Sequence, residues 1–77
     1  MAVHVELRLF ATLGRFLPPS PDQFPIEPGT TIRDLLDRLR ISEDQARLIF
    51  VDGVKKNPAT VLTGGERIGI FPPVGGG

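Results

Sequence analysis

The chain has 77 residues, enough for one domain, and a domain this short must bury a compact core. Hydrophobic residues make up 40% of it, too many for a disordered chain, and the absence of cysteine excludes disulfides and thiolate metal sites. Nine basic and nine acidic residues cancel, so no basic excess indicates nucleic-acid binding, and no apolar run is long enough to cross a membrane. We therefore expect a cytoplasmic domain that binds neither nucleic acid nor membrane.

The first part of the chain predicts a strand, a short turn and a second strand. Apolar and polar residues alternate over residues 3–10, which is typical of a half-buried strand. One face carries Val3, Val5, Leu7 and Leu9, and the other carries His4, Glu6, Arg8 and Phe10. Residues 11–17 have helical spacing for a single turn before a run of prolines stops it. Pro25 lacks an N–H, so the strand that contains it is expected at an edge of the sheet.

The clearest helix follows Gly29. Thr31 is a suitable N-cap, and Asp34 lies near the positive end of the helix. The apolar stripe of this helix consists of Ile32, Leu35, Leu36 and Leu39. A second short turn is predicted over residues 42–46, where Ser42 and Gln45 have the spacing of a capping box.

The last third of the chain predicts two or three strands. Residues 48–51 are a β-prone run, and Asp52-Gly53 after them is a strong hairpin signal, with residues 54–56 returning. A turn at residues 63–65 precedes the last strand, residues 66–71, whose alternation places Ile68 and Ile70 inward and Phe71 outward. Two strands, a helix and then further strands predict an α+β domain with helices on one face of a mixed sheet.

The chain ends in Pro72-Pro73-Val74-Gly75-Gly76-Gly77 after this last strand. The two prolines stiffen the base of the segment, and the three glycines have no Cβ, so six residues reach roughly 20 Å with a thin tip. The α-carboxylate of Gly77 can attack the α-phosphate of ATP to give an acyl-adenylate, which is an electrophile for sulfur. The alternative is an inert frayed end. We therefore divide the chain into a domain, residues 1–71, and an extended tail, residues 72–77.

These features together resemble the MoaD/ThiS family of sulfur carriers, most closely its molybdopterin synthase small-subunit branch. The resemblance runs through the Phe-Ala-Thr-Leu segment at residues 10–13, the Gly-Thr-Thr-Ile-x-Asp-Leu-Leu segment at residues 29–36, the Val-Asp-Gly hairpin and the ending Ile-Phe-Pro-Pro-Val-x-Gly-Gly. The ending is the most specific part. Gly75 departs from the alanine or serine that is more common in the family, and Asp52 from the more common asparagine.

The resemblance implies a ubiquitin-like β-grasp fold, with a mixed sheet of four to five strands packed on one main helix. It also implies a carrier that is not an enzyme and binds no cofactor itself. An E1-like adenylyltransferase would use ATP to adenylate Gly77, and a sulfur donor protein would then convert it to a thiocarboxylate. The large subunit of molybdopterin synthase would use this sulfur to build the dithiolene of the molybdenum cofactor, in a heterotetramer of two small and two large subunits. The residues that would insert into that subunit are Pro72, Pro73, Val74, Gly75 and Gly76.

A partner surface is expected on the outer face of the sheet. Phe71 is outward by alternation, Ile49 is outward by resemblance to ubiquitin, and we expect the two to lie close together beside the start of the tail. Phe10 is a weaker candidate that could instead cap the core. His4 has no second histidine or cysteine at ligand spacing, so we expect a surface strand position and no metal site.

Three alternatives to the molybdopterin pathway stay open. The same carrier chemistry could supply thiamine, cysteine, a tungsten cofactor or a thiolated tRNA base. The chain could also be a ubiquitin-like modifier, joined through Gly77 to lysines of other proteins. The third alternative is an interaction module with an inert tail.

Overall fold

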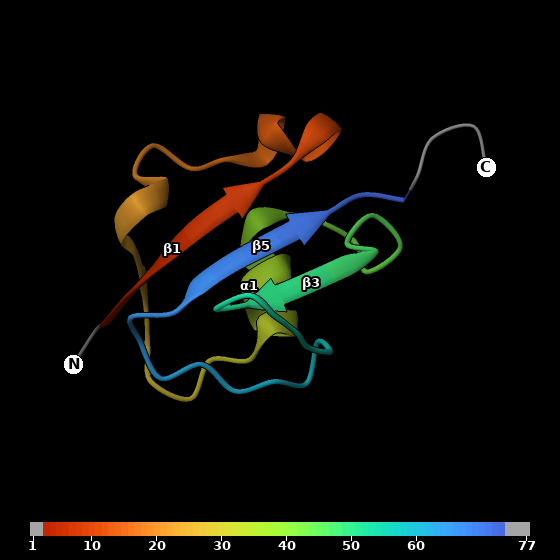
Figure 1. Cartoon of the computed structure of the whole chain (residues 1–77). Coiled ribbons are helices and arrows are strands. Elements are labelled where there is room, and N and C mark those ends of the chain that lie inside the picture. Colours follow the sequence, from red (N-terminus) through yellow and green to blue (C-terminus); the bar gives the residue numbers. More distant parts are fainter. Residues whose placement is uncertain (1–2, 74–77) are drawn as a thin grey trace.

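The computed structural model describes residues 3–73 of the chain. Its elements are β1 (Val3–Leu9), the 3-10 helices η1 (Ala11–Phe16) and η2 (Pro21–Gln23), β2 (Phe24–Ile26), α1 (Ile32–Leu39), β3 (Leu48–Val51), β4 (Val54–Lys55) and β5 (Arg67–Phe71). The strands form one sheet in the order β2-β1-β5-β3-β4, and α1 lies behind it (Figure 1). This mixed sheet with one main helix confirms the predicted α+β fold class.

Strand β5 occupies the centre of the sheet although it is the last strand in the chain. It runs parallel to β1 and antiparallel to β3, so both of its edges are hydrogen-bonded (Figure 1). The edges of the sheet are the short strands β2 and β4. Pro25 lies in β2, as predicted, where its missing N–H costs no bond to a further strand.

Helix α1 begins at the predicted cap. The Thr31 hydroxyl accepts a hydrogen bond from the Asp34 N–H at 3.1 Å, and the Asp34 carboxylate accepts one from the Thr31 N–H at 3.2 Å. This reciprocal capping box satisfies two of the free N–H groups at the start of the helix. The helix ends at Leu39, and the next residue, the C-cap Arg40, has a left-handed φ of 62° that stops further helical turns.

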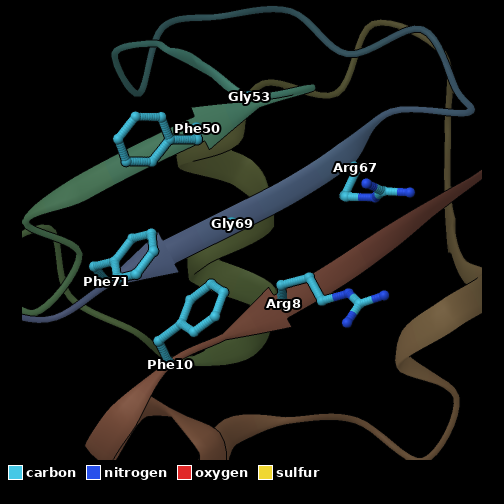
Figure 2. A pocket seen from close by; sticks show the side chains of 7 residues that line it. All are labelled: Arg8, Phe10, Phe50, Gly53, Arg67, Gly69 and Phe71. Carbon is cyan, nitrogen blue, oxygen red and sulfur yellow. The ribbon is translucent and has the colours of Figure 1, made fainter.

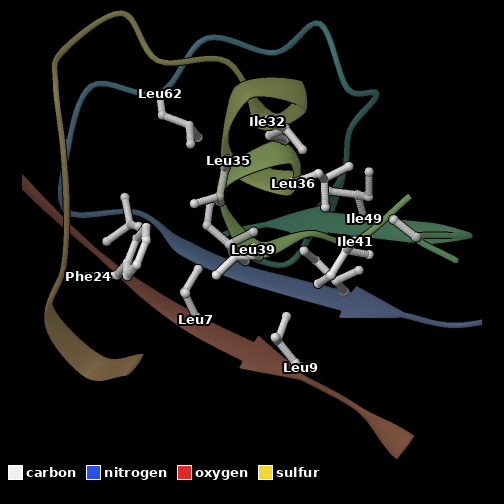
Figure 3. Packing of buried hydrophobic residues seen from close by; sticks show 14 of the residues in the cluster. Leu7, Leu9, Phe24, Ile32, Leu35, Leu36, Leu39, Ile41, Ile49 and Leu62 are labelled. Carbon is white, nitrogen blue, oxygen red and sulfur yellow. The ribbon is translucent and has the colours of Figure 1, made fainter. Parts of the chain in front are cut away.

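One cluster of buried hydrophobic side chains fills the space between α1 and the sheet (Figure 3). The predicted stripe of α1 supplies Ile32, Leu35, Leu36 and Leu39, all of which are buried. The sheet supplies the inward residues of its central strands, Val5, Leu7, Leu9, Ile49, Val51, Ile68 and Ile70. Leu13 of η1 and Phe24 and Ile26 of β2 belong to the same cluster. Ile41, Ala46 and Leu62 come from segments between the regular elements and complete the core, although no periodic pattern marked them.

The predicted hairpin joins β3 to β4. Val51 is directly opposite Val54, so Asp52 and Gly53 alone form the turn. Their φ angles of 52° and 83° are both positive, as a two-residue turn of this kind requires. The hairpin confirms the prediction and fixes the register of β3. No helix within residues 3–73 is long and apolar enough to span a bilayer.

Candidate functional site

The predicted tail starts at the end of β5, the strand that is hydrogen-bonded to a neighbouring strand on both sides. Ile70 of β5 is fully buried, and the carbonyl oxygen of Phe71 accepts a hydrogen bond from the Arg47 N–H at 2.9 Å. Pro72 is half-buried and Pro73 is exposed. The chain therefore leaves the sheet from a fixed point. The remaining residues of the predicted tail, Val74, Gly75, Gly76 and Gly77, lie outside the described residues.

Three phenylalanines form an aromatic cluster beside this point, on the face of the sheet away from α1 (Figure 2). The rings of Phe10 and Phe71 stack with centroids 4.2 Å apart and planes 1° from parallel. Phe50 meets Phe71 edge-on, with centroids 5.7 Å apart. Phe10 is 40% exposed, and the other two are half-buried. Phe10 thus lies on the outer face with Phe71, as the alternation along residues 3–10 predicts, and it does not cap the core.

The backbone just after β1 holds Phe10 in this position. Its N–H donates to the carbonyl oxygen of Ile70 at 3.1 Å, which extends the contact between β1 and β5 by one residue. Ala11 then has a φ of 51°, in the left-handed region that costs an alanine roughly 1–2 kcal/mol. The chain turns there into η1, and the Phe10 ring is left lying against Phe71.

The strand register arranges the outer face of the sheet around Gly69. Arg8 is directly opposite Gly69 on one side, and Phe50 is directly opposite it on the other. Directly opposite residues point to the same face, so Gly69 lies between two long side chains and contributes none itself. An open groove of about 310 Å³ lies above it (Figure 2). The groove is lined by Arg8, Phe10, Phe50, Gly53, Arg67, Gly69 and Phe71.

Two arginines at one end of the groove share a single glutamate. The Arg8 Nε donates to a carboxylate oxygen of Glu6 at 2.6 Å, and the Arg67 Nε lies 3.4 Å from the same oxygen. The arginine side chains are 56% and 67% exposed. A guanidinium has five N–H donors, so most of the donors of Arg8 and Arg67 face solvent. No acidic residue lines the groove within the described part of the chain.

The expectation that Ile49 lies outward is wrong. Ile49 is directly opposite Ile70 and only 3% exposed, so it belongs to the core. Alternation along β5 already places Ile70 inward, and directly opposite residues share a face, so Ile49 has to be inward as well. The outward residues of β3 are its neighbours Leu48 and Phe50. Ile49 is therefore removed from the candidate partner surface.

Sequence reasoning missed Phe50 and Gly69 as parts of the site. Residues 48–51 are all apolar, so no alternation indicates which of them face outward. The available signal was the hairpin, because a two-residue turn at Asp52-Gly53 places Phe50 opposite Lys55, a residue suited to the solvent side. For Gly69 the signal was a glycine inside a strand pattern, which often marks a place where another group approaches closely.

The turn before β5 is stabilised by the Glu66 carboxylate. Its oxygens accept hydrogen bonds from the Thr63 N–H at 2.8 Å and the Gly64 N–H at 2.7 Å. Partial burial raises the pKa of Glu66, but these bonds, with those from its own N–H and the Thr63 hydroxyl, outweigh it and hold the pKa below its usual value. The residue therefore anchors the start of the central strand.

The other chemically active side chains on this sheet make no site. His4 is exposed on β1, which confirms the surface strand position expected for it. Lys55 is exposed on the edge strand β4, and Lys56 follows it. Among residues 3–73, no group of three or more histidine, aspartate or glutamate side chains is placed to hold a metal ion. The aromatic groove and the adjoining start of the tail are thus the best candidate site.

Solved structures with the same fold include small archaeal and bacterial proteins. The SAMP1 protein of Haloferax volcanii is 19% identical with a TM-score of 0.66, and the match covers all of both chains. A putative molybdopterin converting factor subunit 1 from Pyrococcus furiosus is 25% identical with a TM-score of 0.63, over 94% of this chain and 99% of that one. These likenesses confirm the expected β-grasp fold.

A further likeness involves a protein complex. The complex of subunits 1 and 2 of the molybdopterin-converting factor from Helicobacter pylori contains a chain that is 25% identical, with a TM-score of 0.54 and complete coverage of both chains. No curated protein sequence matches the chain. The profile of the ThiS family matches residues 7–77, which is nearly the whole sequence. The chain therefore belongs to the ThiS family, as its resemblance to the MoaD/ThiS sulfur carriers implied.

Proposed function

We propose that this chain is the small subunit of a molybdopterin synthase and carries sulfur as a thiocarboxylate on Gly77. Members of its family are small ubiquitin-like carriers or modifiers, and the family profile extends to residue 77. The observation that carries the proposal is the position of the tail, which starts at the end of the central strand and directly beside an exposed aromatic face. Such a body can be gripped by a partner while the tail reaches into that partner's site.

The proposed chemistry involves a single carboxyl group in two steps. The Gly77 carboxylate attacks the α-phosphate of ATP, pyrophosphate leaves, and an acyl-adenylate forms. A hydrosulfide equivalent from the sulfur donor then attacks the acyl carbon; the carbon–sulfur bond forms, the bond to the phosphate oxygen breaks, and AMP leaves. Glycine at this position keeps the α-carbon unsubstituted, so neither attack is crowded. ATP is bound by the E1-like adenylyltransferase and not by this chain. Because ATP is available in the cytoplasm, we place the reaction there.

The body contributes recognition and not catalysis. Phe71 and Phe10 form the exposed part of the aromatic cluster, and we assign them to the partner surface. Pro72 and Pro73 hold the base of the tail away from the sheet, and the residues that enter the partner are Val74, Gly75 and Gly76. The names of the similar proteins from Pyrococcus furiosus and Helicobacter pylori support the large synthase subunit as the acceptor. We further propose the assembly of two small and two large subunits.

Intact mass spectrometry tests the carrier chemistry. The purified chain is incubated with ATP, the E1-like adenylyltransferase and a sulfur donor protein from the same source, with ATP omitted as the control. The expected product has one oxygen replaced by sulfur, and fragmentation places the change on Gly77. A mass that never changes contradicts the carrier proposal.

A second assay identifies the acceptor. The thiocarboxylated chain is mixed with the large subunit of molybdopterin synthase and its cyclic precursor, and dithiolene formation is measured. Sulfur that is loaded on Gly77 but not transferred to the precursor would assign the carrier to another pathway. Formation of higher-mass conjugates on denaturing gels, in place of a thiocarboxylate, would favour a protein modifier.

A further inference from the structure

We propose that the groove above Gly69 is a socket for one apolar side chain of a partner protein, flanked by carboxylates of that partner that pair with Arg8 and Arg67. This inference rests on the proposed function, because it describes how the carrier is gripped. It identifies Gly69 as the residue that decides which partners fit.

The first argument is the missing side chain at the centre of the outer face. Gly69 lies on the central strand between Arg8 and Phe50, where any other residue would project into the groove. A glycine inside a strand weakens the strand, and its φ is not in the positive range that would require glycine. A Cβ built at this position would meet the Phe10 ring at 3.6 Å and the Phe50 Cβ at 4.0 Å, which are ordinary contact distances. Folding therefore does not require glycine here, whereas an open socket does.

The second argument is the shape and lining of the groove. Phe50, Phe10 and Phe71 form an apolar wall, and the Gly69 backbone forms the floor (Figure 2). Its volume of about 310 Å³ is at the lower limit of small-molecule sites, which enclose most of their ligand within about 300–1,000 Å³. A wide-open groove of this size fits a single protein side chain better than a cofactor. Anchors of this kind, set in an apolar pocket, carry much of the energy of protein interfaces.

The third argument is charge. Arg8 and Arg67 share the one carboxylate of Glu6, and both arginine side chains are more than half exposed at the end of the groove. Lys55 is directly opposite Phe50 and so lies on the same face. The Asp52 carboxylate, which accepts a hydrogen bond from the backbone N–H of Arg67 at 2.9 Å, offsets part of this charge. The three cationic side chains named here still outnumber the two carboxylates, Glu6 and Asp52. A partner surface with an apolar anchor and nearby carboxylates complements this face, and a basic partner surface does not.

Three small probes test the socket without any partner protein. The isotope-labelled chain is titrated by NMR with N-acetylleucine, which combines a branched side chain with a carboxylate, with N-acetylleucinamide, which lacks the charge, and with N-acetylglycine, which lacks the side chain. We expect saturable shifts at the amides of Phe50 and Gly69 with N-acetylleucine, weaker shifts with the amide, and none with N-acetylglycine. Equal shifts with N-acetylglycine, or no saturable shift with N-acetylleucine, would overturn the proposal.

Substitutions at Gly69 test the same socket in the complex. Binding to the purified large synthase subunit and to the purified E1-like adenylyltransferase is measured by calorimetry for the unmodified chain, Gly69→Ala and Gly69→Val. We expect the Kd to rise about 10–100-fold for Gly69→Val and by less for Gly69→Ala, because each added atom occupies space meant for the anchor. The melting temperature should stay the same or rise by roughly 4–8 °C, because valine favours strands. Unchanged affinity of both variants for both partners would overturn the proposal, and Gly69→Ala keeps this test valid if valine disturbs folding.

The charge requirement has a matched control. Arg8→Gln and Arg67→Gln should each weaken binding severalfold and reduce its dependence on salt, whereas Arg33→Gln on α1, behind the sheet, should do neither. Equal effects of all three variants would contradict the assigned charge pairing. Calorimetry without ATP requires no sulfur chemistry. If no thiocarboxylate forms but binding still depends on Gly69, only the proposed function is contradicted. If the thiocarboxylate forms but binding does not depend on Gly69, only the socket is contradicted.

Discussion

The two faces of the central strand β5 differ sharply in burial and in side-chain type. Its inward residues, Ile68 and Ile70, are fully buried against α1 and the neighbouring strands. Its outward residues are the charged Arg67, Gly69, which has no side chain, and Phe71, whose ring is half-buried. The inner face therefore accounts for folding, whereas the outer face gives up burial that a larger residue at Gly69 would provide. This difference is what the proposed partner surface on the outer face requires.

Truncating an inward side chain should give the largest effect. Ile70→Ala leaves a cavity between β5 and the core, and we expect the free energy of unfolding to fall by about 2–5 kcal/mol. Denaturant unfolding followed by circular dichroism measures this loss. A loss close to zero would mean that the two faces do not differ in the way described.

Truncating an outward side chain should affect binding more than folding. Phe71→Ala removes two aromatic contacts worth roughly 0.5–1.5 kcal/mol each, and we expect the affinity for the large synthase subunit to fall at least about tenfold. The matched control is Phe16→Ala on η1, a partly buried phenylalanine that packs against the core. It should lower stability and leave affinity unchanged. Equal loss of affinity in both variants would mean that the aromatic cluster is not the partner surface.

The smallest expected effect concerns the turn that leads into β5. The folded-state pKa of Glu66 is lowered from its usual value of 4.5, so its contribution to stability is present above pH 4.5 and is lost as the pH falls through the folded pKa. Glu66→Gln should therefore be less stable than the unmodified chain at neutral pH, with the difference shrinking in acid. Unfolding measured in urea at several pH values checks this. A difference that does not change with pH would show that the carboxylate charge is unimportant there.

Much of the fold could be predicted from the sequence because short local patterns determine several of its elements. Alternation in residues 3–10, the Thr31 cap with its apolar stripe and the Asp52-Gly53 turn each determine one element regardless of the rest. Ile41, Ala46 and Leu62 could not be predicted as core residues, because they lie in irregular segments whose burial depends on the whole chain. The parallel pairing of β1 with β5 is also non-local and left no signal in either strand.

The candidate site was predicted less completely for a related reason. Phe71 and Phe10 followed from alternation along single strands, and both lie on the outer face. Ile49 was assigned by resemblance across an apolar run without alternation, and the register reversed that assignment. Gly69 became interpretable only when three strands were placed side by side, since its role depends on Arg8 and Phe50 next to it. The tail residues 74–77 stay a prediction.

Adding one residue after Gly77 tests the central claim most directly, because it moves the carboxyl group while leaving residues 3–73 unchanged. We predict that the extended chain keeps its melting temperature and still docks through its aromatic face, but forms no acyl-adenylate and accepts no sulfur by intact mass. Sulfur loading of the extended chain at the normal rate, without removal of the added residue, would contradict the account.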